Sequence, residues 1–215
     1  MEIQRVANAG VMLKLDGVKV LLDAFCSSVG PYLATPESVR HQLLEDSADL
    51  AAFTHAHEDH FDPALVSQYR KQTLRPVLGP ENLPYGTTVR GVAVGGVSVQ
   101  PVKSRHIGKE YFYVPHVSYV IRGSKTVWFL GDAVPSQWHD IQDHADVMIA
   151  PFAYALSESA WKLACRLADM IVLVHMPLRD EDPAGLWPQV ERITAGADRN
   201  KLWIPDMGEI ISILD

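Results

Sequence analysis

The sequence predicts an α/β domain in which two β-sheets pack against each other and helices cover the outer faces. The first quarter of the chain is rich in short strands joined by tight turns. Later strands alternate with segments whose apolar residues recur at helical spacing. Two packed sheets with helices outside would bury all of these faces. Because the 215 residues are 47% hydrophobic and show no repeat or linker, we expect one domain over residues 1–215.

Tight turns and β-branched runs place the strands. Three strands are expected at residues 2–7, 10–15 and 19–23, because Asp16-Gly17 between the last two is a strong two-residue hairpin turn. Gly95-Gly96 predicts a second hairpin within the β-branched segment 89–104. Further strands are expected at residues 49–54, 76–80, 118–122, 126–130, 147–150, 171–174, 202–204 and 209–214.

Five segments have helical spacing of apolar residues. They cover residues 36–46, 63–71, 136–143, 157–168 and 186–195. Thr35 before Pro36, and Asp62 before Pro63, each have the form of an N-cap followed by proline at the first helical position. Cys165 lies among apolar neighbours and is expected to be a buried helix residue.

Charge, hydrophobicity and cysteine content indicate which partners and which cellular compartment to expect. With 19 basic and 26 acidic residues the net charge is −7, so binding to nucleic acid is not expected. No apolar stretch reaches about 18 residues, so no membrane span is expected. The two unpatterned cysteines and the lack of a secretory signal favour a reducing, cytoplasmic compartment. The expected partner is a small-molecule substrate, and assembly into a homo-oligomer is compatible with the sequence.

The run Thr54-His55-Ala56-His57-Glu58-Asp59-His60 is the strongest chemical signal. His55 and His57 are two residues apart on a segment that leaves a strand, so both imidazoles can point the same way. Asp59 and His60 come where the chain turns toward the next helix and can face a neighbouring point. One loop can therefore supply ligands to two cations. Imidazole and carboxylate ligands suit Zn²⁺, and also Mn²⁺ or Fe.

Three further polar residues follow predicted strands. They are His106, Asp132 and His175, and Gly131 before Asp132 allows close approach of the backbone. Ligands in α/β folds collect outside strand ends, so these side chains are expected at the same edge. His116, ten residues after His106, is the rival candidate for a ligand.

The sequence resembles the metallo-β-lactamase-fold hydrolases. The matching pieces are THAHEDH at 54–60, His106, FLGDA at 129–133, His175 in VLVHMP, and Asp23 at the end of KVLLD. The resemblance spans nearly the whole chain and is greatest to the UlaG-like branch, which includes an ascorbate-6-phosphate lactonase. It implies an αββα sandwich of two mixed β-sheets covered by helices.

The resemblance also implies the ligand sets. One metal would be held by His55, His57 and His106, and the second by Asp59, His60 and His175. Asp132 would bridge them, and Asp59 and Asp132 are the expected catalytic carboxylates. His106 is preferred over His116 because it follows a strand directly and matches the family position. Asp23 would orient a ligand histidine or the ligand loop. The implied cofactor is a pair of divalent metal ions, foremost Zn²⁺, with Mn²⁺ or Fe as alternatives.

Two bridged cations can lower the pKa of a water between them and make hydroxide available at pH 7. The expected activity is therefore hydrolysis of a small ester, lactone or phosphoester. The alternative is a non-hydrolytic protein of the same fold, either a di-metal redox protein or a binding or sensing module. A redox role usually needs a flavin domain or partner, and a binding module should lack ligands.

The surroundings of His106 suggest an anionic substrate. Arg105 and Lys109 flank it and can bind a carboxylate or phosphate, while His116 is expected to line the same pocket. Aromatic side chains suited to the walls of a small-molecule site follow at residues 111–113, with Tyr154 and Trp161 further along the chain.

Overall fold

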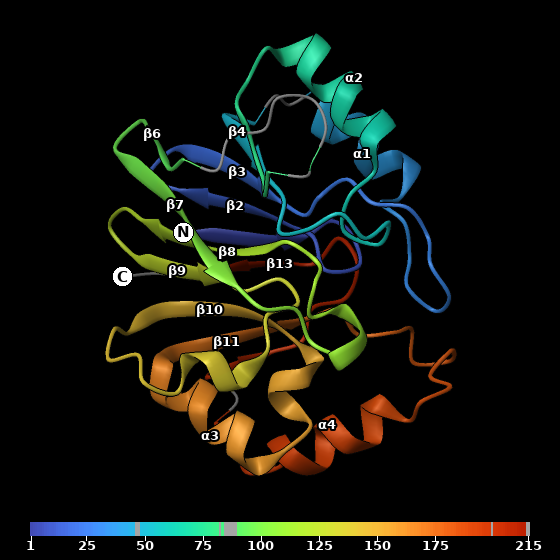
Figure 1. Cartoon of the computed structure of the whole chain (residues 1–215), viewed down its shortest axis with the longest axis vertical. Coiled ribbons are helices and arrows are strands. Elements are labelled where there is room, and N and C mark those ends of the chain that lie inside the picture. Colours follow the sequence, from blue (N-terminus) through green and yellow to red (C-terminus); the bar gives the residue numbers. More distant parts are fainter. Residues whose placement is uncertain (46–47, 82, 84–89, 199, 214–215) are drawn as a thin grey trace.

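Two β-sheets lie face to face, with helices on both outer faces (Figure 1). The structure is a computed structural model that describes residues 1–45, 48–81, 83, 90–198 and 200–213. In it, α1 and α2 cover one sheet, and α3 and α4 cover the other (Figure 1). This is the αββα sandwich expected from the sequence. The first position of the segment expected at 89–104, and the last positions of those at 36–46 and 209–214, lie outside the described residues.

The first sheet is mixed. Its order is β13-β1-β2-β3-β4-β5, antiparallel from β13 to β3 and parallel from β3 to β5. The φ angles of Asp16 and Gly17 between β2 and β3 are 51° and 81°, which confirms the predicted hairpin turn. The strands are β1 (Glu2–Arg5), β2 (Val11–Leu15), β3 (Val18–Leu22), β4 (Leu50–Ala52), β5 (Val77–Leu78) and β13 (Ile210–Ser212).

The second sheet is also mixed. Its order is β12-β11-β10-β9-β8-β7-β6, antiparallel from β6 to β9 and parallel from β9 to β12. Gly95 and Gly96, with φ of 54° and 87°, form the predicted turn between β6 and β7. The strands are β6 (Val92–Val94), β7 (Val97–Ser104), β8 (His116–Arg122), β9 (Thr126–Phe129), β10 (Ala145–Pro151), β11 (Ala168–Val174) and β12 (Leu202–Trp203).

Strand alternation divides the core into three layers. In β10, Val147 and Ile149 face the cluster between the sheets, while Met148 faces the cluster beneath α3 and α4. In β2, Leu13 likewise points between the sheets and Met12 toward α1 and α2. Because both faces of each sheet are covered, these strands are apolar nearly throughout.

Within the described residues, four α-helices form the outer layers: α1 (Glu37–Glu45), α2 (Pro63–Thr73), α3 (Glu158–Leu167) and α4 (Leu186–Thr194). Asp62 accepts hydrogen bonds from the backbone N–H groups of Ala64 and Leu65, as an N-cap does. The cap expected of Thr35 is wrong. Its hydroxyl is buried, donates to Ala24 O and accepts from Cys26 N, so it ties down the loop before α1 instead.

Two further expectations are corrected. The segment expected as a helix at 136–143 is only a 3₁₀ turn, η2 (Pro135–Trp138), because the Arg166 guanidinium binds the carbonyls of Trp138, His139 and Ile141 from outside. Cys165 lies on α3 but is exposed. The buried positions of α3 repeat at helical spacing on one face, and Cys165 falls outside them. No helix in the described residues is long and apolar enough to cross a membrane.

Candidate metal centre

Four strand ends deliver polar side chains to one edge of the sandwich. The loop after β4 carries His55, His57, Asp59 and His60. His106 follows β7 and pairs by a backbone bridge with Ala133, next to the Asp132 that follows β9. His175 directly follows β11, and its N–H bonds to Asn8 O in the β1–β2 loop. Residues from both sheets therefore meet at this edge, as the sequence predicts.

The side chains form three overlapping groups that could hold a metal ion. Each offers three nitrogen or oxygen atoms that lie within 4.8 Å of one another. The groups are His55, His57 and His106; His55, His60 and Asp132; and Asp59, His60 and His175. His55 Nε2 is 3.1 Å from His57 Nδ1 and 3.2 Å from His106 Nε2. His175 Nε2 is 3.1 Å from Asp59 Oδ2.

Asp132 lies between the first and the third of these groups, which we call the outer groups. Its Oδ2 is 3.5 Å from His60 Nε2, 3.5 Å from His175 Nε2 and 3.6 Å from His106 Nε2. One carboxylate oxygen thus approaches histidines of both outer groups. This is the position that a carboxylate shared by two cations would need.

The donor atoms fit a bound cation. Within the described part of the chain, His60 Nε2, both ring nitrogens of His175 and Asp132 Oδ1 are buried and have no hydrogen-bond partner. A buried polar atom without a partner costs about 1–3 kcal/mol. Histidine nitrogens and carboxylate oxygens are the ligands that Zn²⁺ and related metals take, so cations at this cluster would satisfy these atoms.

At His55, His57 and Asp132 the electrostatics match the ionisation states that metal ligands need, whereas at His60 the charges of Asp132 and Asp23 outweigh burial and raise the pKa. Burial lowers the pKa of His55 well below its ordinary 6.5, and lowers that of His57 less strongly. Burial alone would raise the pKa of Asp132, but His175 and His60 beside it hold the pKa well below 3.8. At pH 7, His55 and His57 are therefore neutral and Asp132 is charged.

Asp23 fixes the loop of residues 54–60 by hydrogen bonds. This carboxylate is fully buried at the end of β3 and accepts three hydrogen bonds. They come from Thr54 N at 2.7 Å, Thr54 Oγ1 at 2.6 Å and His60 Nδ1 at 2.8 Å. With Nδ1 bonded to Asp23, the Nε2 atom of His60 is left free to face Asp132. These are the contacts expected of Asp23, which orients both a histidine and the loop.

Two residues that position the site were not predicted. Asn8 is fully buried, and its Nδ2 donates to Asp59 Oδ2 at 3.4 Å. No sequence pattern marks Asn8, because it belongs to a short loop brought to the site only by the pairing of β1 and β2. Arg5 is buried and donates to the carbonyls of Ala7, Pro205 and Met176, so it ties this loop to the residue after His175.

Aromatic rings border the cluster on two sides. The Tyr32 ring is 4.4 Å from the His175 ring, and Phe152 is 5.7 Å from it. Tyr111 lies 5.1 Å from both His57 and His106. Tyr111 is therefore at the site as expected, whereas Tyr32 and Phe152 were missed. The position of Phe152 directly after β10 could have revealed it, since neighbouring parallel strands end at the same edge.

The other aromatic candidates are corrected. Tyr154 is fully buried, and its hydroxyl accepts a hydrogen bond from Trp138 Nε1 at 2.6 Å. Trp161 is half-buried and packs against the core cluster beneath α3. Both residues belong to the layer between the second sheet and its helices, so neither forms a wall of the candidate metal site.

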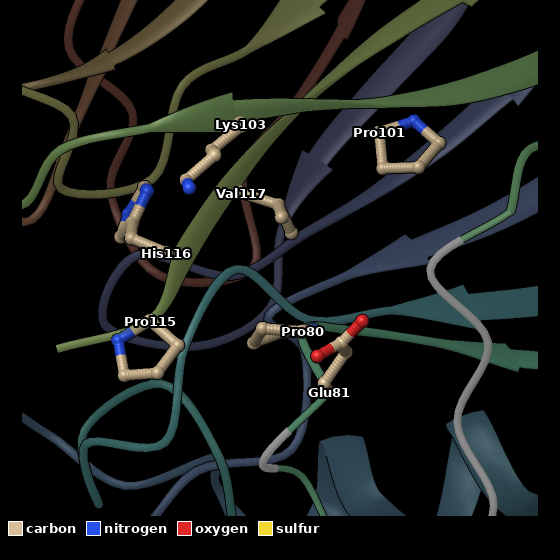
Figure 2. Close-up of a pocket in the computed structure, with 7 residues that line it drawn as sticks. All are labelled: Pro80, Glu81, Pro101, Lys103, Pro115, His116 and Val117. Carbon is tan, nitrogen blue, oxygen red and sulfur yellow. The ribbon is translucent and has the colours of Figure 1, made fainter.

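The residues expected to bind substrate have different surroundings. Arg105 and Lys109 are exposed on either side of the buried His106. His116 is buried at the start of β8, beside the rings of His55 and His106. It also lines a pocket of about 650 Å³, which Figure 2 shows together with Lys103 and Glu81. Three other histidines are exposed: His41, His139 and His144.

Comparison with known proteins places the chain in a family. A model described as the β-lactamase superfamily domain matches residues 2–175. The chain belongs to the β-lactamase superfamily. Its two mixed sheets between helices are the metallo-β-lactamase fold, and the His and Asp groups occupy one edge of that fold. No curated protein matches this superfamily member significantly.

Solved structures share the fold at low sequence identity. A possible metal-dependent hydrolase from Veillonella parvula is 15% identical with a TM-score of 0.74, over 99% of each chain. An isothiocyanate hydrolase from Delia radicum gut bacteria is 16% identical with a TM-score of 0.70, also over 99% of each chain. CmlA, a diiron β-hydroxylase from Streptomyces venezuelae, is 14% identical with a TM-score of 0.67, over 99% of this chain and 54% of that one.

Proposed function

We propose that this superfamily member is a metal-dependent hydrolase whose site holds two divalent cations. The observation that carries the proposal is the position of Asp132 Oδ2, within 3.5–3.6 Å of histidine nitrogens from both outer groups. One cation would be held by His55, His57 and His106, and the other by Asp59, His60 and His175. Asp132 would contact both. Zn²⁺ suits this ligand set best, and Mn²⁺ or Fe are the alternatives.

Two such cations would supply hydroxide at neutral pH and polarise the carbonyl or phosphoryl oxygen of a substrate. The ionisation states of the surrounding residues favour cation binding. The neutral imidazoles of His55 and His57 offer free lone pairs, and the charged Asp132 offsets part of the metal charge. Cys26 is buried near the loop before α1, and burial raises the pKa of its thiol, so it is a poor nucleophile. No protein nucleophile is required.

The proposed substrate is a small, anionic ester, lactone or phosphoester, as in the UlaG-like branch that the motifs resemble. The exposed cations Arg105 and Lys109 flank His106 and support a negative charge on the substrate. The rings of Tyr32, Tyr111 and Phe152 around the histidines support a compact organic group beside the scissile bond.

Metal content and turnover test the proposal together. Protein purified without chelator and loaded with Zn²⁺ or Mn²⁺ is expected to hold about two cations per chain. It should hydrolyse at least one member of a panel of carboxylic esters, lactones and phosphodiesters, with an isothiocyanate added because a protein of similar fold acts on one. Removal of the metal should abolish turnover, and readdition should restore it.

Two outcomes would contradict this function. The first is metal content near zero after careful loading. The second is a site that binds two irons, consumes O₂ and hydrolyses nothing on the panel, which would favour the oxidative alternative.

Removing the flanking cations should change substrate binding more than turnover. Arg105→Ala and Lys109→Ala are each expected to raise KM for an anionic substrate by about 1.5- to 5-fold, the effect of an exposed charge pair worth about 0.2–1 kcal/mol. The effect should fade at high salt because exposed charges are screened. KM for a neutral analogue, measured in parallel, should stay unchanged.

A matched control is Lys71→Ala, which removes an exposed lysine of α2. It is expected to leave both KM values as in the wild type. Equal changes in KM for the anionic and neutral substrates would refute a charge-specific role for Arg105 and Lys109.

A further inference from the structure

His116 is buried, and both of its ring nitrogens are engaged within the protein. Nε2 accepts a hydrogen bond from the backbone N–H of Asp132 at 3.1 Å. Nδ1 lies 2.7 Å from Ser104 Oγ. A backbone N–H can only donate, so Nε2 carries no proton. The neutral ring therefore carries its proton on Nδ1 and donates it to Ser104.

The hydrogen bonds continue through two serines. Ser118 Oγ is 3.0 Å from Ser104 Oγ and 2.9 Å from the carbonyl oxygen of Leu130. A hydroxyl has one proton, and a carbonyl can only accept. Ser118 is the donor in both contacts, so its one proton is shared between Ser104 Oγ and Leu130 O. Both serines are buried, so no solvent competes for these bonds.

The two ends of this chain of hydrogen bonds meet at one short turn. It starts at Asp132 N and ends at Leu130 O, the residues on either side of Gly131. Gly131 has φ of 53°, and a Cβ there would lie 2.5 Å from the Thr54 side chain of the ligand loop. The turn therefore packs tightly against Thr54 of the ligand loop, and the hydrogen bonds with His116 and Ser118 hold it to β8 and, through Ser104, to β7. A shift of this turn would move the Asp132 carboxylate away from the histidines.

We propose that His116, Ser104 and Ser118 form a clamp that positions Asp132 at the metal centre. His116 in this role is a positioning residue. It acts through Asp132 and not as a metal ligand. The inference rests on the proposed function in one respect, namely that Asp132 is the residue shared by both cations.

Three variants on one strand separate the clamp from general destabilisation. His116→Phe removes both hydrogen bonds of the ring, whereas His116→Gln keeps an acceptor for Asp132 N. The matched control is Tyr119→Phe, three residues further along β8, which removes the buried hydrogen bond from the Tyr119 hydroxyl to Phe53 O. Zn²⁺ affinity and stoichiometry are measured by competition with a chromophoric chelator, and melting temperature is measured alongside.

His116→Phe is expected to weaken Zn²⁺ binding by about 10- to 100-fold, as for loss of a group that holds a metal ligand. His116→Gln should recover affinity to within about 3-fold of the wild type. Tyr119→Phe should bind Zn²⁺ like the wild type even if its melting temperature falls. Wild-type affinity in His116→Phe would overturn the clamp. So would loss of one whole zinc equivalent in His116→Gln, which would make His116 a ligand.

An NMR measurement on the metal-free protein tests the clamp without metal or substrate. The ¹⁵N shifts of the His116 ring should show the proton on Nδ1, and the amide proton of Asp132 should exchange slowly in the wild type and rapidly in His116→Phe. A proton on Nε2, or equal exchange in both proteins, would overturn the proposal. If instead the wild type binds no metal and hydrolyses nothing while these NMR results hold, the clamp stands and the proposed function fails.

Discussion

Asp132→Ala is expected to lower kcat/KM by about 10²- to 10³-fold or more, the loss that follows removal of a preorganised charge at a reacting centre. Asp132 Oδ2 approaches three histidine nitrogens from both outer groups, so its loss affects both proposed cations. At least one metal equivalent should also be lost. The measurements are kcat/KM on the best substrate of the panel and metal content after gel filtration.

The fold should survive this change. The hydrogen bond from residue 132 to His116 uses the backbone N–H, which alanine keeps. Asp132→Asn is the matched variant, because it preserves the shape of the side chain and removes its charge. A loss in Asp132→Asn close to that in Asp132→Ala would assign the effect to charge. Activity near that of the wild type in either variant would show that Asp132 does not bridge two cations.

Asp23→Ala is expected to reduce the free energy of unfolding by about 3–5 kcal/mol, the usual effect of removing one partner from a buried charged network. Asp23 is fully buried and accepts hydrogen bonds from Thr54 N, Thr54 Oγ1 and His60 Nδ1. Alanine would leave the Thr54 N–H and the His60 Nδ1–H buried without this acceptor. Urea unfolding of the metal-free protein measures the loss, and zinc affinity should fall by about 10- to 100-fold.

The loss in Asp23→Ala should depend on pH. Burial alone would lower the pKa of His60, but Asp132 and Asp23 outweigh burial and raise the pKa well above 6.5. A raised histidine pKa stabilises the folded state fully below the unfolded value of about 6.5 and loses this contribution as pH rises through the folded pKa. Removing Asp23 should therefore destabilise the metal-free protein most below about pH 6.5.

Asp62→Ala is the matched control for Asp23. Asp62 caps α2 at the end of the same loop, so its loss should cost about 1 kcal/mol and leave zinc affinity unchanged. If Asp23→Ala destabilises the protein no more than Asp62→Ala does, and at no particular pH, the buried network around Asp23 does not stabilise the ligand loop as described.

Turn and helix-cap preferences predicted correctly those parts of the fold whose conformation depends on residues adjacent in the sequence. The turns at Asp16-Gly17 and Gly95-Gly96, and the cap at Asp62, follow from the conformations that these residues prefer, whatever surrounds them. The same rules failed at Thr35 and at the segment after Pro135. The Thr35 hydroxyl donates to Ala24 O, and the carbonyls of His139 and Ile141 accept from Arg166, so in both places residues distant in sequence decide the structure.

The sequence by itself determined the sandwich and the set of metal-binding candidates. Tight turns and β-branched runs mark the strands, helical spacing of apolar residues marks the outer helices, and the loop from His55 to His60 carries four candidate ligands at a spacing that needs no tertiary information. His106, Asp132 and His175 could be added because polar residues at the ends of buried strands must lie at a sheet edge.

Only the tertiary structure decided what surrounds those ligands. Asn8 and Tyr32 reach Asp59 and His175 through loops without any periodic pattern. The orientation of His116 depends on an acceptor on β7 and a donor in the turn after β9. Hydrogen-bond direction is a property of paired atoms. A histidine in a sequence could be ligand, base or support, and the role of His116 became visible only when the partners of both ring nitrogens were known.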